Sequence, residues 1–374
     1  MKYSSFLIKP ASGSCNMACR YCFYRDVSAH REQGNLGLMS GEILEALVRR
    51  ALEETEYVCS FAFQGGEPTL VGLPFYRQLV ELQQKYNTHG VRIQNSIQTN
   101  GYRLNEEWAS FFAENHFLVG ISIDGTRDIH DAARVNAVGN GTYDDVERVT
   151  RLFDTFHVEY NILCVVTASL ARRGEQVYRH FLRHNWRYMQ FIPCLDPLEA
   201  ERGEEQWSLT PERYGRFLCR LYDAWYTDAR QHKAPSVRHI DNWLGILCGY
   251  PPENCAMSGQ CQPYFVVEAD GGVYPCDFYV TDEWRMGNIA SDSLDNLLHS
   301  ETAKRFRLTV PLTEECRQCV YAPLCRGGCR RDRMMTAEGF AVNYYCEAYR
   351  KFFAHALPSL RQLALNPRSP YRVG

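Results

Sequence analysis

Short apolar runs alternate with segments of helical period over roughly the first half of the chain. The runs that predict β-strands are residues 5–10, 59–66, 92–101, 117–125, 159–167 and 188–195. Between them, residues 40–54 and 74–86 repeat apolar side chains at the spacing of an amphipathic helix. This alternation predicts an α/β fold in which helices cover a parallel sheet, either an open doubly wound sheet or a complete or partial barrel. Ligands then gather where the strands end, because loops at the carboxyl ends of parallel strands share one edge.

The pattern changes after the sixth strand. A charged loop at 196–212 leads into a helix at 211–230, and the tail at 347–364 predicts another amphipathic helix. Residues 264–279 alternate like a hairpin around an Asp-Gly-Gly turn. We therefore predict a barrel over 1–230, a connector over 231–254, a small cysteine-rich domain over 255–350, and a C-terminal helix and tail over 351–374.

Composition excludes some classes of function. The 374 residues carry 41 basic and 44 acidic side chains, a net charge of −3, which gives no electrostatic basis for binding nucleic acid or an anionic membrane. The first residues lack the apolar core of a secretion signal, and no apolar run reaches membrane-spanning length. We expect a soluble cytoplasmic protein.

Sixteen cysteines are unusual in such a protein. A reducing cytosol disfavours disulfides, so clustered cysteines there indicate metal ligands or redox groups. Five lie singly in apolar surroundings and are predicted to be small buried hydrophobes: Cys59, Cys164, Cys194, Cys219 and Cys248. The other eleven are clustered.

The first cluster holds three thiols, Cys15, Cys19 and Cys22, directly after the first predicted strand. Structural zinc prefers four protein ligands. A cubane iron–sulfur cluster normally takes four thiolates, so three would leave one iron open to another molecule.

The spacing C-x3-C-x-aromatic-C, with Tyr21 as the aromatic residue, resembles the signature of radical S-adenosylmethionine (SAM) enzymes. Three further stretches match in order: 65–68 (GGEP), 122–125 (SIDG) and 130–134 (HDAAR). The resemblance implies a partial (β/α)6 barrel whose cluster chelates SAM and cleaves it to methionine and a 5′-deoxyadenosyl radical. The SAM-binding residues that it implies are Tyr21, Gly66, Glu67, Ser122, Arg134 and Leu195.

The second set of cysteines is spaced C-x9-G-x4-C, then C-x2-C-x5-C-x3-C, then a last C. Spacing alone also permits two zinc sites with four cysteines each. The pattern resembles the SPASM module, which implies two auxiliary [4Fe–4S] clusters and a total of three clusters in the chain. The first ligand set that it implies is Cys255, Cys261, Cys276 and Cys329, and the second is Cys316, Cys319, Cys325 and Cys346.

Asp277 directly follows Cys276 in an aromatic stretch. A carboxylate in such a pocket is suited to accept a proton from a substrate, whereas capping a turn is the structural alternative. Nearly the whole chain resembles the anaerobic sulfatase-maturating enzymes, through segments such as 7–24, 61–70, 190–198 and 273–289. That resemblance implies Asp277 as the base.

The same resemblance implies the reaction. The radical takes a β-hydrogen from a cysteine or serine in a C/S-x-P/A-x-R motif of an unfolded sulfatase, and oxidation through the auxiliary clusters yields Cα-formylglycine. A low-potential donor such as ferredoxin or flavodoxin supplies the electron. Tyr24 and Gln64 line the same strand ends, where peptide contact and core packing are both open. The chain starts at the barrel, so we expect no separate leader-peptide domain.

Two alternatives stay open at this point. Another SPASM enzyme would form a thioether or carbon–carbon crosslink, which the mass of the product peptide distinguishes from an aldehyde. A zinc-stabilised interaction protein would carry about two zinc ions, whereas three cubane clusters carry about twelve irons.

Overall fold

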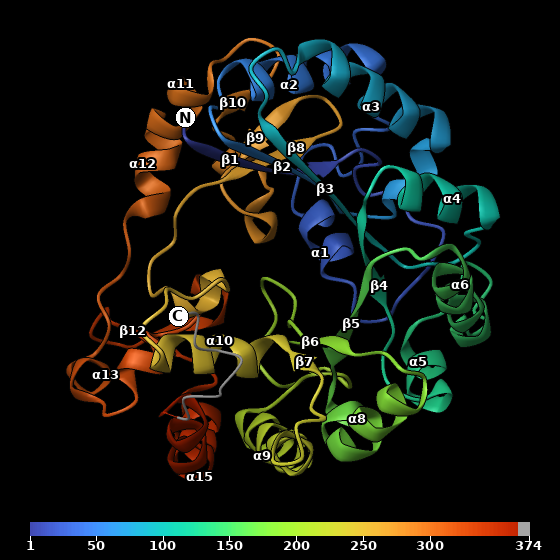
Figure 1. The fold of residues 1–374 in the computed structure, drawn as a ribbon. Coiled ribbons are helices and arrows are strands. Elements are labelled where there is room, and N and C mark those ends of the chain that lie inside the picture. Colours follow the sequence, from blue (N-terminus) through green and yellow to red (C-terminus); the bar gives the residue numbers. More distant parts are fainter. Residues whose placement is uncertain (366–374) are drawn as a thin grey trace. The chain divides into compact units, whose positions relative to one another are not determined.

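The computed structural model describes residues 1–365, and they form two compact units (Figure 1). The first unit contains residues 1–123, 130–161 and 262–308, and the second contains 124–129, 162–261 and 309–365. The last nine positions of the predicted C-terminal segment lie outside the described residues. Among residues 1–365, no helix has the length and apolar character needed to cross a membrane.

The strands and helices follow the predicted alternation closely. The strands are β1 (Tyr3–Lys9), β2 (Val58–Phe63), β3 (Arg92–Thr99), β4 (Leu118–Ser122), β5 (Tyr160–Val166), β6 (Tyr188–Pro193), β7 (Ser236–Val237), β8 (Phe265–Glu268), β9 (Gly272–Tyr274), β10 (Gly287–Asn288), β11 (Arg333–Met335) and β12 (Ala341–Asn343). The α-helices are α1 (Phe23–Ala29), α2 (Gly41–Glu53), α3 (Leu73–Tyr86), α4 (Glu106–Glu114), α5 (Arg127–Ala133), α6 (Tyr143–Phe156), α7 (Ala168–Ala171), α8 (Gly174–Arg183), α9 (Pro211–Ala229), α10 (Arg238–Leu247), α11 (Leu294–His299), α12 (Glu301–Arg307), α13 (Glu314–Gln318), α14 (Ala322–Cys325) and α15 (Cys346–Leu365).

In the first unit, the strands are ordered β10-β9-β8-β1-β2-β3-β4. Strands β1 to β4 are parallel, and β8 joins the other edge of β1 in parallel as well. Helices α2 and α3 run along the outer side of these strands (Figure 1). The parallel α/β arrangement predicted from the sequence is confirmed, and the six predicted strands correspond to β1 to β6.

Local sequence explains why these elements form. Ser40 caps α2 by accepting a hydrogen bond from the backbone of Ile43, and the apolar stripe of the helix is buried. On the sheet, Phe6 of β1 stacks between Phe61 and Phe265, with ring centroids 5.9 and 5.0 Å apart. Aromatic contacts across neighbouring strands thus hold β2, β1 and β8 together.

The predicted hairpin is confirmed as β8 and β9, which pair antiparallel. Gly271 lies in the turn with φ of 81°, a conformation that favours glycine. The sequence did not predict that β8 would also pair with β1, although Lys9 and Glu268 are register partners at the ends of these two strands. The pairing places the segment that leads to Asp277 beside the end of β1.

In the second unit, residues of β5 pair in parallel with β6, which pairs in parallel with β7. The C-terminal helix α15 is confirmed and packs along α9 and α10. Phe352 of α15 contacts Tyr222 of α9 and Trp243 of α10, with ring centroids 5.8 and 4.6 Å apart. The cysteine-rich segment from residue 309 onward adds α13, α14 and the small β11–β12 pair.

Phe61 is a suitable test of this core because it is fully buried in β2. We expect Phe61→Ala to lower the free energy of unfolding by about 3–5 kcal/mol, since it removes a large side chain from the packed sheet. Calorimetry of the anaerobic holoprotein measures the loss as a lower thermal midpoint. The control is Tyr57→Ala, which truncates an exposed ring; an equal fall in both variants would contradict the assigned core.

Candidate functional site

The loop after β1 gathers the first three cysteines. Backbone bonds fasten it: the Ala18 nitrogen donates to Val135 at 2.8 Å and the Arg20 nitrogen donates to Ala133 at 3.0 Å. Enclosure by surrounding atoms raises the pKa of Cys15 to about 12, and the negative charges of Glu67, Cys19 and Cys22 add to the increase. The three thiols are therefore near enough to influence one another.

The Gly65–Gly66 loop after β2 lies directly against this cysteine loop. A Cβ on Gly66, where φ is 51°, would stand 2.2 Å from the carbonyl oxygen of Ser14. The backbone nitrogen of Glu67 donates to that same oxygen at 2.8 Å. Only glycine fits position 66, and the two loops are joined backbone to backbone.

The Glu67 carboxylate is almost fully buried and is occupied by protein atoms. Its Oε1 accepts hydrogen bonds from the Thr69 and Thr99 hydroxyls at 2.7 and 2.8 Å, and its Oε2 accepts from the Asn100 nitrogen at 2.8 Å. Burial raises the pKa of Glu67, and these hydrogen bonds oppose the increase. The side chain ties the end of β3 to the loop after β2.

The remaining candidate SAM contacts also lie at strand ends. The Arg134 guanidinium donates to the Tyr21 hydroxyl at 2.9 Å, which links the end of α5 to the cysteine loop. The Ser122 hydroxyl accepts from Gln98 at 3.0 Å at the ends of β4 and β3. Leu195 is partly exposed after β6 and belongs to the second unit.

Asp277 is buried, with 5% of its surface exposed, and both carboxylate oxygens have partners. Its Oδ1 lies 3.3 Å from the Lys9 ammonium. Its Oδ2 accepts from the Tyr24 hydroxyl at 2.7 Å and from Gln64 at 3.2 Å. Burial first, and the Asp277 charge second, raise the pKa of Tyr24 well above its usual value, so the phenol stays a proton donor.

Sequence reasoning identified Asp277, Tyr24 and Gln64 but missed Lys9. The signal was present, because Lys9 is the one charged side chain in the apolar run at 5–10. Glu268 has the same character in β8, and it is fully buried as well. A charged residue at the end of a buried strand is costly unless it has a partner, and this rule points to both residues.

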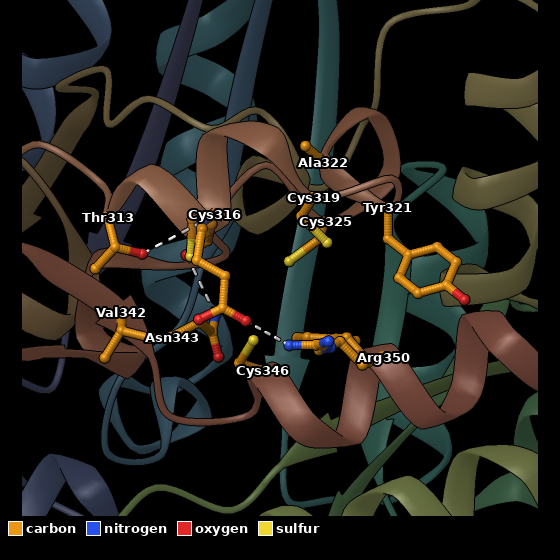
Figure 2. A pocket seen from close by; sticks show the side chains of 13 residues that line it. Thr313, Cys316, Cys319, Tyr321, Ala322, Cys325, Val342, Asn343, Cys346 and Arg350 are labelled. Carbon is orange, nitrogen blue, oxygen red and sulfur yellow. Dashed lines mark hydrogen bonds and ion pairs between the residues drawn. The ribbon is translucent and has the colours of Figure 1, made fainter.

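In the second unit, four thiols surround one cavity of about 60 Å³ (Figure 2). They are Cys316, Cys319, Cys325 and Cys346. Burial raises the pKa of Cys346 to about 11, and negative charge on Cys316 and Cys325 adds to the increase. Arg350, labelled in Figure 2, also lines the cavity and pairs with Glu315 at 2.6 Å.

The donor set of this cavity fits a [4Fe–4S] cluster, which four thiolates ligate. Within residues 1–365, no group of three or more Cys, His, Asp or Glu side chains has the spacing of a site for a single metal ion. The three thiols after β1 fit a cluster with one open iron.

The residues expected at the other auxiliary cluster are divided between the units. Cys276 belongs to the first unit, where it precedes Asp277, and Cys255, Cys261 and Cys329 belong to the second. Burial and the neighbouring charge of Cys261 raise the pKa of Cys255. The sulfur of Cys329 accepts a hydrogen bond from the Arg331 nitrogen at 3.4 Å.

Comparison with known proteins agrees with this geometry. The family profile described as Radical SAM superfamily matches residues 10–168, and the profile of an iron–sulfur cluster-binding domain, SPASM, matches 255–320. The cysteine-type anaerobic sulfatase-maturating enzyme of Clostridium perfringens is 46% identical over 97% of this chain and 98% of its own. The chain belongs to the anaerobic sulfatase-maturating enzymes.

Two further relatives extend the comparison of this radical SAM oxidoreductase. The serine-type enzyme of Bacteroides thetaiotaomicron is 32% identical over 98% of this chain and 93% of its own. The structure of native anSMEcpe with bound AdoMet superposes with a TM-score of 0.92 at 46% identity, covering 97% of this chain and 99% of that one. The family therefore implies SAM and [4Fe–4S] clusters as cofactors, as the resemblance predicted.

The contact between the two loops predicts the effect of Gly66→Ala. The added Cβ meets the Ser14 carbonyl, so the cysteine loop has to move, and we expect the loss of about four irons per chain as one cubane cluster fails to bind. Iron and sulfide analysis of anaerobically purified protein measures the loss. The matched control is Gly90→Ala, which also has positive φ (69°) but has no atom within 4 Å of the added Cβ. Full iron content in Gly66→Ala would contradict the assigned contact.

Proposed function

We propose that this chain oxidises a cysteine in the C-x-P/A-x-R motif of an unfolded sulfatase to Cα-formylglycine, with Asp277 as the base. The β-carbon of the cysteine would lose one hydrogen atom to the radical derived from SAM, and the thiol would lose one proton to Asp277. The electron that leaves the resulting substrate radical would go to an auxiliary cluster. The product is a thioaldehyde, which water converts to the aldehyde and hydrogen sulfide. Atoms and charges balance without molecular oxygen, since water supplies the oxygen atom of the aldehyde.

The observation that carries the proposal is the position of the buried Asp277 carboxylate. It directly follows Cys276, a proposed cluster ligand, and faces the ends of β1 and β2, from which the cysteine loop and the Gly65–Gly66 loop begin. A base beside a proposed ligand of an auxiliary cluster is suited to take the proton of the substrate thiol, since the electron would leave toward the same cluster.

The residues around Asp277 have distinct tasks. The Lys9 ammonium forms an ion pair with Oδ1 at 3.3 Å. Gln64 and the Tyr24 hydroxyl hold Oδ2, and the two side chains also contact one another at 2.5 Å. The arrangement fixes the direction in which Asp277 presents its oxygens, and proximity of this kind supplies much of the catalytic effect.

Cys15, Cys19 and Cys22 would hold the cluster that binds SAM, and Tyr21, Gly66, Glu67, Ser122, Arg134 and Leu195 would hold SAM itself. When bound, this pair supplies the radical that takes the hydrogen atom. The proposed auxiliary ligands are Cys255, Cys261, Cys276 and Cys329 for one cluster and Cys316, Cys319, Cys325 and Cys346 for the other. Four thiolates complete each cubane, so these clusters suit electron transfer.

Cysteine is the proposed target because of the relatives. The cysteine-type enzymes are 44–46% identical to this chain, whereas the serine-type enzymes are 30–32% identical. A structure of native anSMEcpe with bound AdoMet and Cp18Cys peptide superposes with a TM-score of 0.92. A peptide with cysteine in the motif is therefore the substrate to test first, and the serine peptide is its comparison.

Two further elements of the proposal concern the cellular setting and the division of the chain. A low-potential protein such as ferredoxin or flavodoxin is the proposed electron donor, and the cytoplasm is the proposed location. Residues 1–230 would form the radical SAM part and 255–350 the SPASM part, with 231–254 between them and 351–374 as the C-terminal segment.

Asp277→Asn tests the base directly. We expect the variant to release deoxyadenosine from SAM, whereas formation of the aldehyde falls about 100-fold or more, since an amide cannot accept the proton. Mass spectrometry of an 18-residue peptide with C-x-P-x-R measures the aldehyde, and chromatography measures deoxyadenosine.

The control for this substitution is Asp295→Asn, which makes the same change at an exposed carboxylate of α11. It is expected to keep the wild-type yield. Wild-type amounts of aldehyde from Asp277→Asn would remove Asp277 from the mechanism, and a crosslinked peptide instead of an aldehyde would reject the proposed reaction.

A further inference from the structure

A chain of four buried charges runs from Asp277 into the first unit. The Lys9 ammonium lies 3.3 Å from Asp277 and 3.9 Å from Glu268, and the Arg31 guanidinium donates to Glu268 at 2.7 Å. The side chains of Lys9, Glu268 and Arg31 are between 0 and 3% exposed. The series contains two cations and two anions, and their signs alternate from Asp277 to Arg31.

Glu268 is the centre of this arrangement because it joins two elements. In the sheet, Glu268 is the register partner of Lys9, at the last position of β8 and β1. Its second oxygen, Oε2, accepts from the Ala269 nitrogen at 3.3 Å. A slip of the pairing by one residue would set Lys9 against Val267 or Ala269, so the ion pair specifies the register of the strand that leads to Asp277.

The second element is α1. Arg31 donates to the Ser28 hydroxyl in α1 and to the Gly34 carbonyl oxygen, both at 3.0 Å. Through Arg31, Glu268 therefore also holds the helix whose first turn carries Tyr24. The Lys9 ammonium also lies 4.4 Å from the centre of the Tyr24 ring. Lys9 and Tyr24 both contact Asp277, and both therefore depend on the Glu268 carboxylate.

Stability alone does not account for these charges. All four positions of β8 are buried, and its other members are Phe265, Val266 and Val267. An apolar pair at positions 9 and 268 would avoid the desolvation of ions, and such replacements are often neutral or stabilising in other proteins. A buried charge pair that specifies geometry is the better explanation of its presence here.

We propose that Glu268, held by Arg31, is a positioning residue of the reaction. It orients Lys9 and Tyr24 toward Asp277 and fixes the register of β8, the strand that precedes Asp277. This inference rests on the proposed function. Glu268 touches neither substrate nor cofactor in this role, and it acts only through Lys9 and Arg31.

The test compares Glu268→Gln with the paired variant Arg31→Met/Glu268→Leu in the holoenzyme. Glu268→Gln leaves the Arg31 charge buried without a counterion, so it is expected to lower the thermal midpoint. The paired variant removes one cation and one anion together, leaves Lys9 balanced by Asp277, and is expected to recover the midpoint. Both variants lose the carboxylate that positions Lys9.

The decisive readout is the ratio of aldehyde to deoxyadenosine with a cysteine peptide. We expect this ratio to fall about 10- to 100-fold in both variants, the effect of misplacing a catalytic group. SAM cleavage itself and the KM for the peptide are expected to change little. The control, Glu107→Gln, makes the same substitution in an exposed ion pair with Arg77 and is expected to keep the wild-type ratio.

The outcomes distinguish a failure of the positioning role of Glu268 from a failure of the proposed function. Recovery of both midpoint and ratio in the paired variant would mean that Glu268 is only structural and would overturn the inference, as would a wild-type ratio in Glu268→Gln. If Glu268→Gln does not fold, the paired variant decides alone. Absence of aldehyde from the wild-type enzyme would reject the proposed function instead, and only the wild-type measurement tests that function.

Discussion

The parallel pairing of β1 with both β2 and β8 is the constraint on which the candidate site depends. Because the three strands run in the same direction, their carboxyl ends meet at one edge of the sheet. The cysteine loop follows β1, the Gly65–Gly66 loop follows β2, and Glu268 ends β8. Residues as distant as Lys9 and Asp277, 268 positions apart, are thereby brought into contact.

Backbone contacts help to hold the loop that carries the first three thiols. Gly66 touches Ser14 through main-chain atoms, and the Glu67 carboxylate ties the loop after β2 to the end of β3. Fixing a loop in this way positions its thiol groups before a cofactor arrives. Preorganisation of this kind reduces the cost of assembling a reactive site.

The sequence predicted what depends on local pattern. Helices α2, α3 and α15 were visible as segments of helical period, and α9 was predicted as a helix after the charged loop. The β8–β9 hairpin was visible as alternation around a turn. The eleven clustered cysteines and Asp277 were identified from spacing and resemblance. Their roles in binding clusters and in catalysis stay predictions, although the structure gathers four of these thiols around one cavity.

The pairing of β8 with β1 could not be predicted, because nothing local in either strand specifies a partner so far away in the sequence. Lys9 was missed although the apolar run carries a signal for it, because a single lysine at the end of such a run does not tell which residue will be its partner. Glu67 is a related case, since the motif match did not tell that its carboxylate would be bonded to protein atoms. Pairwise tertiary contacts decide each of these cases.

The carboxylates and the clustered thiols of this protein have different surroundings. The carboxylates of Glu268 and Asp277 are accompanied by cations, whereas enclosure raises the pKa of Cys15 to about 12 and of Cys346 to about 11. A thiol binds metal as the thiolate, so metal binding at these cysteines would release protons. Iron makes this possible because a coordinated thiol is deprotonated outright. Assembly of a cluster at these thiols would therefore be coupled to proton release, whereas the charges around Asp277 are already paired by the fold.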